Sequence, residues 1–139
     1  RHQRSGAARV VERHGSLHQT RCLDCGRIAS VDEDADGVVR CGICGGVARP
    51  HIVWFGEVLP EDAWRQAVAA SAQAALMLVV GTSAQVYPAA GLVELAAEAG
   101  AAIVEVNPGP AALSSLATWA IRLPAGEALP QLLEEASVP

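Results

Sequence analysis

The chain has 139 residues, a length typical of one domain with its own core, and 51% of them are apolar. Its net charge is −5 and its ten basic residues, all arginine, are scattered, so nucleic acid is not the expected partner. The mean hydropathy is +0.27, but the longest apolar run covers only residues 74–81, too short to cross a bilayer, and no membrane insertion is expected.

Residues 1–21 contain the first chemical lead, a histidine. His14 follows a short β-like run around Val10 and Val11, and we expect it at the carboxyl end of a strand, where Gly15 permits an irregular backbone. In this setting a histidine can be a general base or a structural side chain, and the residues alone leave both open. Structural or surface roles are expected for the other histidines, which are His2, His18 and His51.

Residues 22–50 contain two Cys-x2-Cys pairs, separated by fifteen residues. Two such pairs form a tetrahedral set of four sulfurs with no open position, which predicts a structural Zn²⁺ site and places the chemistry elsewhere. The alternatives are rubredoxin-like iron, two disulfides or four unrelated thiols. Disulfides fit poorly because no stretch is typical of a signal peptide, and we expect a cytoplasmic location. The predicted ligands are Cys22, Cys25, Cys41 and Cys44, with Gly26, Gly42, Gly45 and Gly46 beside them to let the backbone turn sharply.

An acidic segment over residues 32–37 lies between the two pairs. It lacks the spaced ligands and the terminal Glu of a calcium-binding loop, so it predicts a solvated hairpin tip.

Residues 51–139 alternate two patterns. Continuous apolar runs predict buried strands over residues 76–80, 103–106 and 119–123. Alanine-rich segments predict helices that start near Pro60 and that cover residues 88–98 and 127–136. Strands alternating with helices form right-handed βαβ crossovers, so the expected fold class is α/β with a parallel sheet and an inserted zinc module.

Two of these strands end in residues suited to a nucleotide. Gly81-Thr82-Ser83 follows one strand, and Asn107-Pro108-Gly109 follows the next. Glycine permits close backbone approach, and hydroxyl and amide groups can bond phosphate or ribose. Each segment alone can be a simple turn, but ligands bind beyond the carboxyl ends of parallel strands, so the two together favour a nucleotide site.

Six segments occur in a distinctive order: residues 12–16 (Glu-Arg-His-Gly-Ser), the two cysteine pairs, residues 49–57 (Arg-Pro-His-Ile-Val-Trp-Phe-Gly-Glu), residues 81–83 and residues 106–107. This series resembles the sirtuins, a family of NAD-dependent protein lysine deacylases, over nearly the whole chain. Residues 54–57 and 86–88 are most similar to the bacterial and mitochondrial branch that includes desuccinylases. One departure is Arg13, where the family usually has leucine.

The resemblance implies a partial Rossmann-like parallel sheet with an inserted zinc-ribbon module. It divides the chain into residues 1–21, the end of the first Rossmann part with the catalytic histidine segment, residues 22–50, the zinc-binding module, and residues 51–139, the C-terminal Rossmann-like part. It implies removal of acetyl or succinyl groups from protein lysines, with NAD converted to nicotinamide and O-acyl-ADP-ribose. His14 would be the general base. NAD would be held by Gly81, Thr82, Ser83, Asn107, Pro108, Gly109 and Ala125, and the acyl-lysine peptide by Val53, Phe55, Gly56, Glu57, Val86 and Tyr87.

A second departure concerns two family motifs that this sequence lacks, a glycine-rich Gly-Ala-Gly-Ile-Ser segment and a Gln-Asn-x-Asp motif. The chain therefore resembles the C-terminal part of a sirtuin, and we expect these 139 residues alone to bind NAD weakly. The determinants of acyl selectivity lie, in this family, in the part that is not matched. The alternative function is a catalytically inactive, zinc-stabilised module that binds peptides or serves as an interaction surface.

Overall fold

The computed structural model describes residue 2 and residues 5–31 and 37–136. They divide into two compact units, Arg1–Arg65 and Gln66–Pro139, and each is described by itself. None of the described helices combines the length and the apolar character that a bilayer crossing requires.

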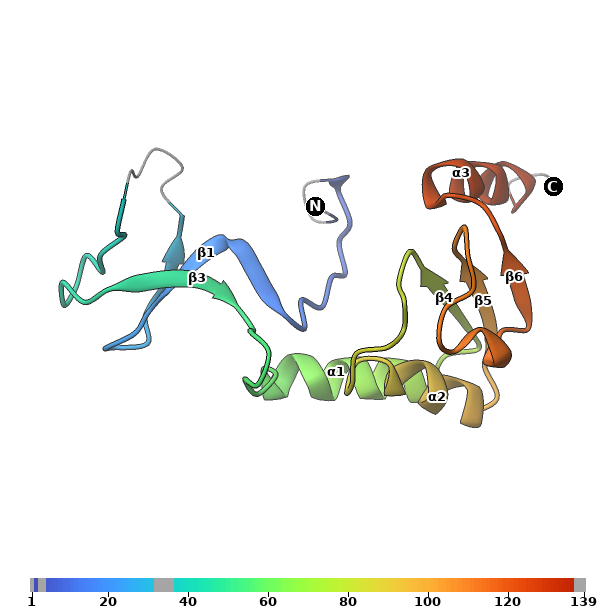
Figure 1. Cartoon of the computed structure of the whole chain (residues 1–139), viewed down its shortest axis with the longest axis horizontal. Coiled ribbons are helices and arrows are strands. Elements are labelled where there is room, and N and C mark those ends of the chain that lie inside the picture. Colours follow the sequence, from blue (N-terminus) through green and yellow to red (C-terminus); the bar gives the residue numbers. More distant parts are fainter. Residues whose placement is uncertain (1, 3–4, 32–36, 137–139) are drawn as a thin grey trace. The chain divides into compact units, whose positions relative to one another are not determined.

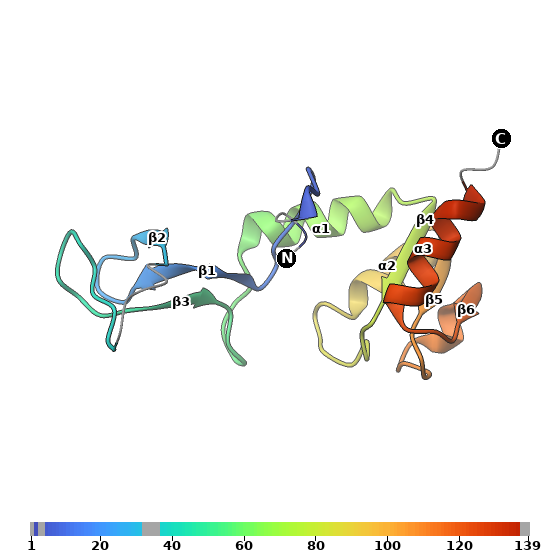
Figure 2. The same cartoon turned by 90° about the horizontal axis from the view of Figure 1, so that it is seen from above.

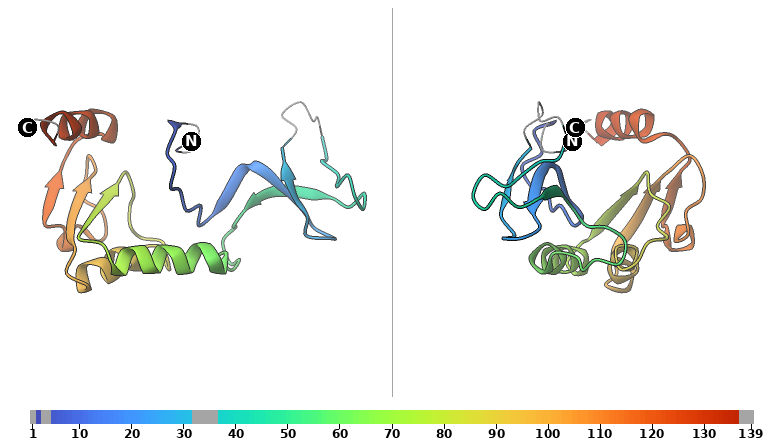
Figure 3. Two further views of the ribbon diagram at one scale, coloured as in Figure 1. Left: turned by 180° about the vertical axis from the view of Figure 1, so that it is seen from behind. Right: turned by 60° about the vertical axis from the view of Figure 1, so that its left-hand side comes forward.

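The first unit contains an antiparallel sheet of three strands. They are β1 (Gly15–Cys22), β2 (Ile28–Ser30) and β3 (Ala48–Ile52), in the order β2-β1-β3. Figure 2 shows β1 between its two neighbours, and Figure 3 shows β1 and β3 side by side. The acidic hairpin tip predicted over residues 32–37 lies, apart from Gly37, outside the described residues.

The predicted setting of His14 is wrong in one respect. We expected it at the carboxyl end of a strand, but residues 5–14 contain no strand, and His14 lies in a turn directly before β1. The N–H of Gly15 donates to the carbonyl oxygen of Glu12 across this turn. An apolar run of two residues is too short to specify a strand, and the partner strand β3 pairs with the residues from Gly15 onward.

The second unit contains a parallel sheet in the order β4-β5-β6, and the three arrows point the same way in Figure 1. The strands are β4 (Leu76–Val80), β5 (Ala102–Val106) and β6 (Trp119–Ile121). Their last residues, Val80, Val106 and Ile121, are in register, so the three carboxyl ends lie at one edge. The predicted α/β class with a parallel sheet is confirmed.

The described residues also form three α-helices. Helix α1 (Glu61–Ala72) follows Pro60 and has two acidic residues in its first turn, Glu61 and Asp62, as suits the positive end of a helix dipole. Helix α2 (Gly91–Glu98) begins three residues later than predicted, because residues 87–90 form turns. Helix α3 (Ala125–Ala136) begins two residues earlier, and a short 3₁₀ helix, η2 (Ser114–Leu116), precedes β6.

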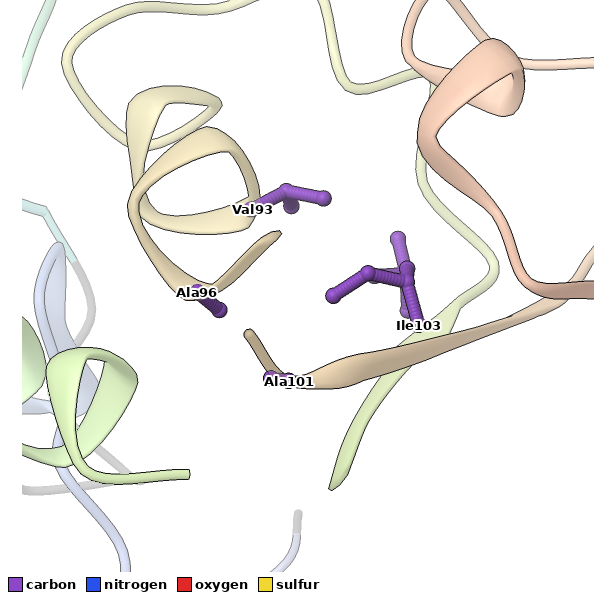
Figure 4. Packing of buried hydrophobic residues seen from close by; sticks show 5 residues of the cluster. Val93, Ala96, Ala101 and Ile103 are labelled. Atoms are coloured by element: carbon purple, nitrogen blue, oxygen red, sulfur yellow. The ribbon is translucent and has the colours of Figure 1, made fainter. Parts of the chain in front are cut away.

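The core of the second unit lies between α2 and the sheet. Val93 and Ala96 of α2 pack against Val79 of β4 and Ile103 of β5, with Ala101 beside them (Figure 4). Ile103 and Ala96 are almost wholly buried. This packing fixes α2 against the sheet. The loops that follow the strands emerge at the carboxyl edge of the same sheet. The division of the chain at residues 21/22 and 50/51 stays a prediction.

Candidate functional site

The four cysteine sulfurs of the first unit form one cluster. Cys22 closes β1, and the second pair lies in the loop before β3. The Sγ atoms of Cys22 and Cys44 are 3.5 Å apart, those of Cys25 and Cys41 are 3.7 Å apart, and all four lie within 4.8 Å of one another. Since Zn–S bonds are about 2.3 Å, ligands of a tetrahedral zinc ion lie about 3.8 Å apart, so this sulfur set fits zinc.

Backbone amides of the two turns point at the sulfurs. The Cys25 amide lowers the pKa of Cys22, and the Cys44 amide lowers the pKa of Cys41 to about 6. The Gly46 amide also donates to the Cys44 sulfur, but hydrogen bonds with the Cys22 and Cys25 thiols outweigh it and raise the pKa of Cys44 to about 12. All four cysteines are free, and the turn amides favour the thiolate forms that a metal binds. The donor set therefore fits a structural zinc ion.

His14 lies beside the predicted peptide-binding loop. The start of β1 pairs with the end of β3, and Gly15 lies opposite Ile52. Just beyond this pair, the N–H of Val53 donates to the carbonyl oxygen of His14 at 2.9 Å. The His14 side chain is exposed. The predicted base and the first predicted substrate residue are therefore neighbours, although 39 positions separate them in the sequence.

Arg49 of β3 holds the loop that follows Val53. Its guanidinium bonds the Glu57 carboxylate at 2.6 Å and the carbonyl oxygen of Ile52 at 3.0 Å, and it lies 4.6 Å from the centre of the Trp54 ring. Glu57 in turn accepts a hydrogen bond from the Trp54 N–H, and the pKa of its carboxyl is lowered by that amide and by Arg49. Between these fixed points Phe55 is 94% exposed, so the loop presents an aromatic side chain to solvent.

Val86 and Tyr87 lie exposed in the second unit, in the loop between β4 and α2. The Tyr87 hydroxyl donates to Glu94 Oε1 at 2.7 Å, and this bond raises the pKa of Tyr87. The bond fixes the ring against the first turn of α2.

The predicted nucleotide residues meet at the carboxyl edge of the parallel sheet. Gly81 has a φ of +60° directly after β4, and its N–H donates to the carbonyl oxygen of Val106. The side-chain amide of Asn107, directly after β5, donates to the carbonyl oxygen of Thr82 at 2.9 Å. Ala125, the first residue of α3, follows β6, and backbone N–H groups at a helix start have no partner inside the helix. These hydrogen bonds hold the loops after β4 and β5 together, and the groups left for a ligand at this edge include the side-chain hydroxyls of Thr82 and Ser83 and the N–H groups at the start of α3.

Sequence reasoning gave no role to three residues whose side chains bond these loops: Arg49, Glu105 and Arg122. Glu105 interrupts an apolar strand, and a charge inside a buried run is a signal that could have found it. Arg49 and Arg122 carry no comparable signal, because their partners are set by the fold.

Residues 1–88 match the model of the Sir2 family. The chain belongs to the Sir2 family. An NAD-dependent protein deacylase of Mycolicibacterium paratuberculosis is 52% identical over 140 residues, which cover 96% of this chain and 59% of that protein. The resemblance to sirtuins is therefore confirmed.

Solved Sir2 structures have the same fold. A Sir2–p53 peptide–NAD⁺ complex matches with a TM-score of 0.90 at 35% identity, over 99% of this chain and 60% of the other. A complex of a Sir2 homolog with NAD matches with a TM-score of 0.93 at 37% identity, over 96% of this chain and 53% of the other. The chain thus spans between 53% and 60% of these relatives' lengths. The roles of individual Sir2-type site residues in this chain remain predictions.

Proposed function

We propose that the protein carrying this chain removes acyl groups, acetyl or succinyl, from protein lysines with NAD as co-substrate. The reaction consumes NAD, acyl-lysine and water, and it yields nicotinamide, free lysine and O-acyl-ADP-ribose. The observation that carries the proposal is the match of residues 1–88 to the Sir2 family, because these residues include His14, the four cysteines and the loop over residues 53–57.

The contact between His14 and Val53 supports a catalytic role for the histidine. Imidazole changes charge near pH 7, and its neutral form can accept a proton. In the proposed reaction a base must take a proton from a ribose hydroxyl, which then attacks the carbon of the transferred acyl group. The hydrogen bond between the two backbones fixes His14 next to the loop that would hold the acyl-lysine.

The strand-end residues of the second unit support the nucleotide part. The proposal assigns the phosphates and adenosine ribose of NAD to Gly81, Thr82, Ser83 and the loop from Asn107 to Gly109, with the amide of Ala125 meeting adenine. The proposal assigns the acyl-lysine peptide, bound in extended form, to residues 53–57 of the first unit and to residues 86–87 of the second, with backbone groups supplying affinity and pockets supplying selectivity.

Zinc has a structural part in this proposal. The four cysteines would fill its coordination sphere, so no position would remain for a substrate or a water. The cluster therefore stabilises the turns beside β1 and β3 and takes no part in the transfer. We also infer a cytoplasmic location, since thiolate ligands persist in reducing compartments, and cell fractionation with tagged protein tests it.

The test uses the full-length protein that carries this chain, NAD and an acetylated or succinylated peptide. Mass spectrometry should detect deacylated peptide and O-acyl-ADP-ribose in equal amounts. His14→Ala should lower the rate by about 10²–10⁴-fold, the usual cost of losing a general base. Exchange of labelled nicotinamide into NAD should persist in this variant, because it precedes the step that needs the base.

His18→Ala is the matched control, because His18 is an exposed histidine of β1. It should leave the rate unchanged. Equal rates for the two variants would mean that His14 is structural. A wild-type protein that binds acyl-peptide without turnover would favour the inactive binding module.

A further inference from the structure

Glu105 is a carboxylate in the middle strand of the parallel sheet. Glu105 is only 3% exposed, and the other residues of β5 are apolar. Burying a charge is unfavourable unless it is paired and hydrogen-bonded. The contacts that compensate for this burial show what the side chain holds in place.

One carboxylate oxygen of Glu105 joins two segments. Its Oε1 accepts from Arg122 Nη1 at 2.8 Å and from the backbone N–H of Ala111 at 3.1 Å. The same Nη1 of Arg122 donates to the carbonyl oxygen of Gly109 at 3.2 Å. Glu105 and Arg122 therefore bond the backbone of the loop over residues 107–111 at two positions, Ala111 and Gly109.

This loop is also tied to the end of β4. The Asn107 side chain donates to the carbonyl oxygen of Thr82, and the N–H of Ala112 donates to the carbonyl oxygen of Ser83 at 2.9 Å. At its start, the N–H of Asn107 donates to the carbonyl oxygen of Ile121 at 3.0 Å. The loop thus connects all three strand ends, and two of its backbone groups also bond the buried Glu105 and its exposed partner Arg122.

We propose that Glu105 and Arg122 are positioning residues that hold the loop over residues 107–111 in the shape that binds the adenosine ribose of NAD. This inference rests on the proposed function. Neither side chain needs to touch the nucleotide, since each acts through the backbone at Gly109 and Ala111. Losing either member should loosen the loop and weaken nucleotide binding.

A direct contact between Arg122 and a phosphate is the competing explanation, because the Arg122 side chain is 37% exposed at this edge. The two explanations predict opposite effects of Glu105→Gln. If Arg122 binds phosphate, removing its ion-pair partner frees the guanidinium and maintains or raises affinity. If the pair positions the loop, the same change lowers affinity.

The experiment measures ADP-ribose binding by calorimetry in the full-length protein that carries this chain. Glu105→Gln, which keeps the shape of the side chain, and Arg122→Met should each weaken binding by about ten-fold, as expected when a hydrogen bond to a charged group is lost. Steady-state rates should show a higher KM for NAD with kcat changed less than KM. Without nucleotide, hydrogen exchange at the amides of Ala111 and Ala112 should accelerate in both variants.

The control is Arg65→Met, which removes an equivalent arginine from exposed ion pairs with Glu61 and Asp62 on α1. Its ADP-ribose affinity should equal that of the wild type. The inference is overturned if Glu105→Gln maintains or raises affinity, or if both variants match the control. A wild-type protein that binds no ADP-ribose would overturn the inference together with the proposed function.

Discussion

At the scale of single residues, Gly15 explains how His14 is placed beside β3. Its φ is +75°, and a Cβ built on it would lie 2.1 Å from the carbonyl oxygen of His51. Two separate constraints therefore require glycine here: a left-handed backbone and the close approach of the neighbouring strand.

Gly15→Ala should destabilise the first unit and lower turnover, because the backbone of β3 must move to admit a methyl group. Gly37→Ala is the matched control, since Gly37 has a φ of +86° and open space around its Cβ. The control should lose about 1 kcal/mol, the usual cost of left-handed backbone, and Gly15→Ala should lose clearly more. Denaturant unfolding measures both, and equal losses would show that the contact with His51 is relaxed in solution.

Because Glu105 is a partly compensated buried carboxylate, the free energy of unfolding should depend on pH through this single residue. The Arg122 guanidinium holds the pKa of this carboxyl below its usual range, against the opposing effect of burial. A carboxyl with a lowered folded-state pKa adds stability above its unfolded pKa, about 4.3, and loses it as the pH falls through the folded value. The difference in unfolding free energy between wild type and Glu105→Gln should therefore be constant above about pH 5.5 and shrink in more acidic solution. Denaturant unfolding across this range measures it, and a difference that grows on acidification would contradict it.

At the scale of elements, β3 and the loop that follows it are held together by one side chain of the strand. Arg49 lies on the strand, and its guanidinium bonds Glu57 and covers the Trp54 ring. We expect the loop that carries Phe55 to keep its shape only while this arginine is present, because a planar guanidinium makes these contacts together and an ammonium cannot.

Arg49→Lys should raise KM for the acyl-peptide by about ten-fold, the cost of losing a charge-assisted hydrogen bond, with a smaller change in kcat. Hydrogen exchange at the Trp54 amide should accelerate, since Glu57 is its acceptor. Arg65→Lys is the control on α1 and should change neither quantity. A variant with unchanged exchange at Trp54 would show that Arg49 does not hold the loop.

At the scale of the whole molecule, the two units should respond differently to loss of zinc. Metal analysis should find one zinc ion for each chain. Chelation or Cys41→Ser should unfold the sheet of β1–β3, because apparent zinc-binding energies of about 10–16 kcal/mol are folding energy in such sites. The sheet of β4–β6 has its own core, around Val79 and Ile103, and should keep its amide protection.

Hydrogen exchange with mass spectrometry resolves the two responses in one experiment. A chelator added to Cys41→Ser should have no further effect, which controls for actions of the chelator other than metal removal. A folded, metal-free first unit would contradict the zinc prediction, and a red protein would identify iron in its place.

The sequence by itself determined the features that depend on neighbours along the chain. Two Cys-x2-Cys pairs specify a four-sulfur set because each pair closes one tight turn. The apolar run over residues 76–80 specifies a strand, but not one buried on both faces, since Val79 is buried whereas Leu76 and Leu78 are 54% and 51% exposed. The residues after β4 and β5 could be expected at one edge, since parallel strands end together.

Only the tertiary structure decided which distant residues meet. The sequence suggested a strand before His14, whereas the register of β1 against β3 places His14 in a turn beside Val53. The pairing of Glu105 with Arg122 likewise depends on the alignment of β5 with β6. Side-chain charge can be read from one position, but the partner of a charge depends on register, and register depends on packing across the whole sheet.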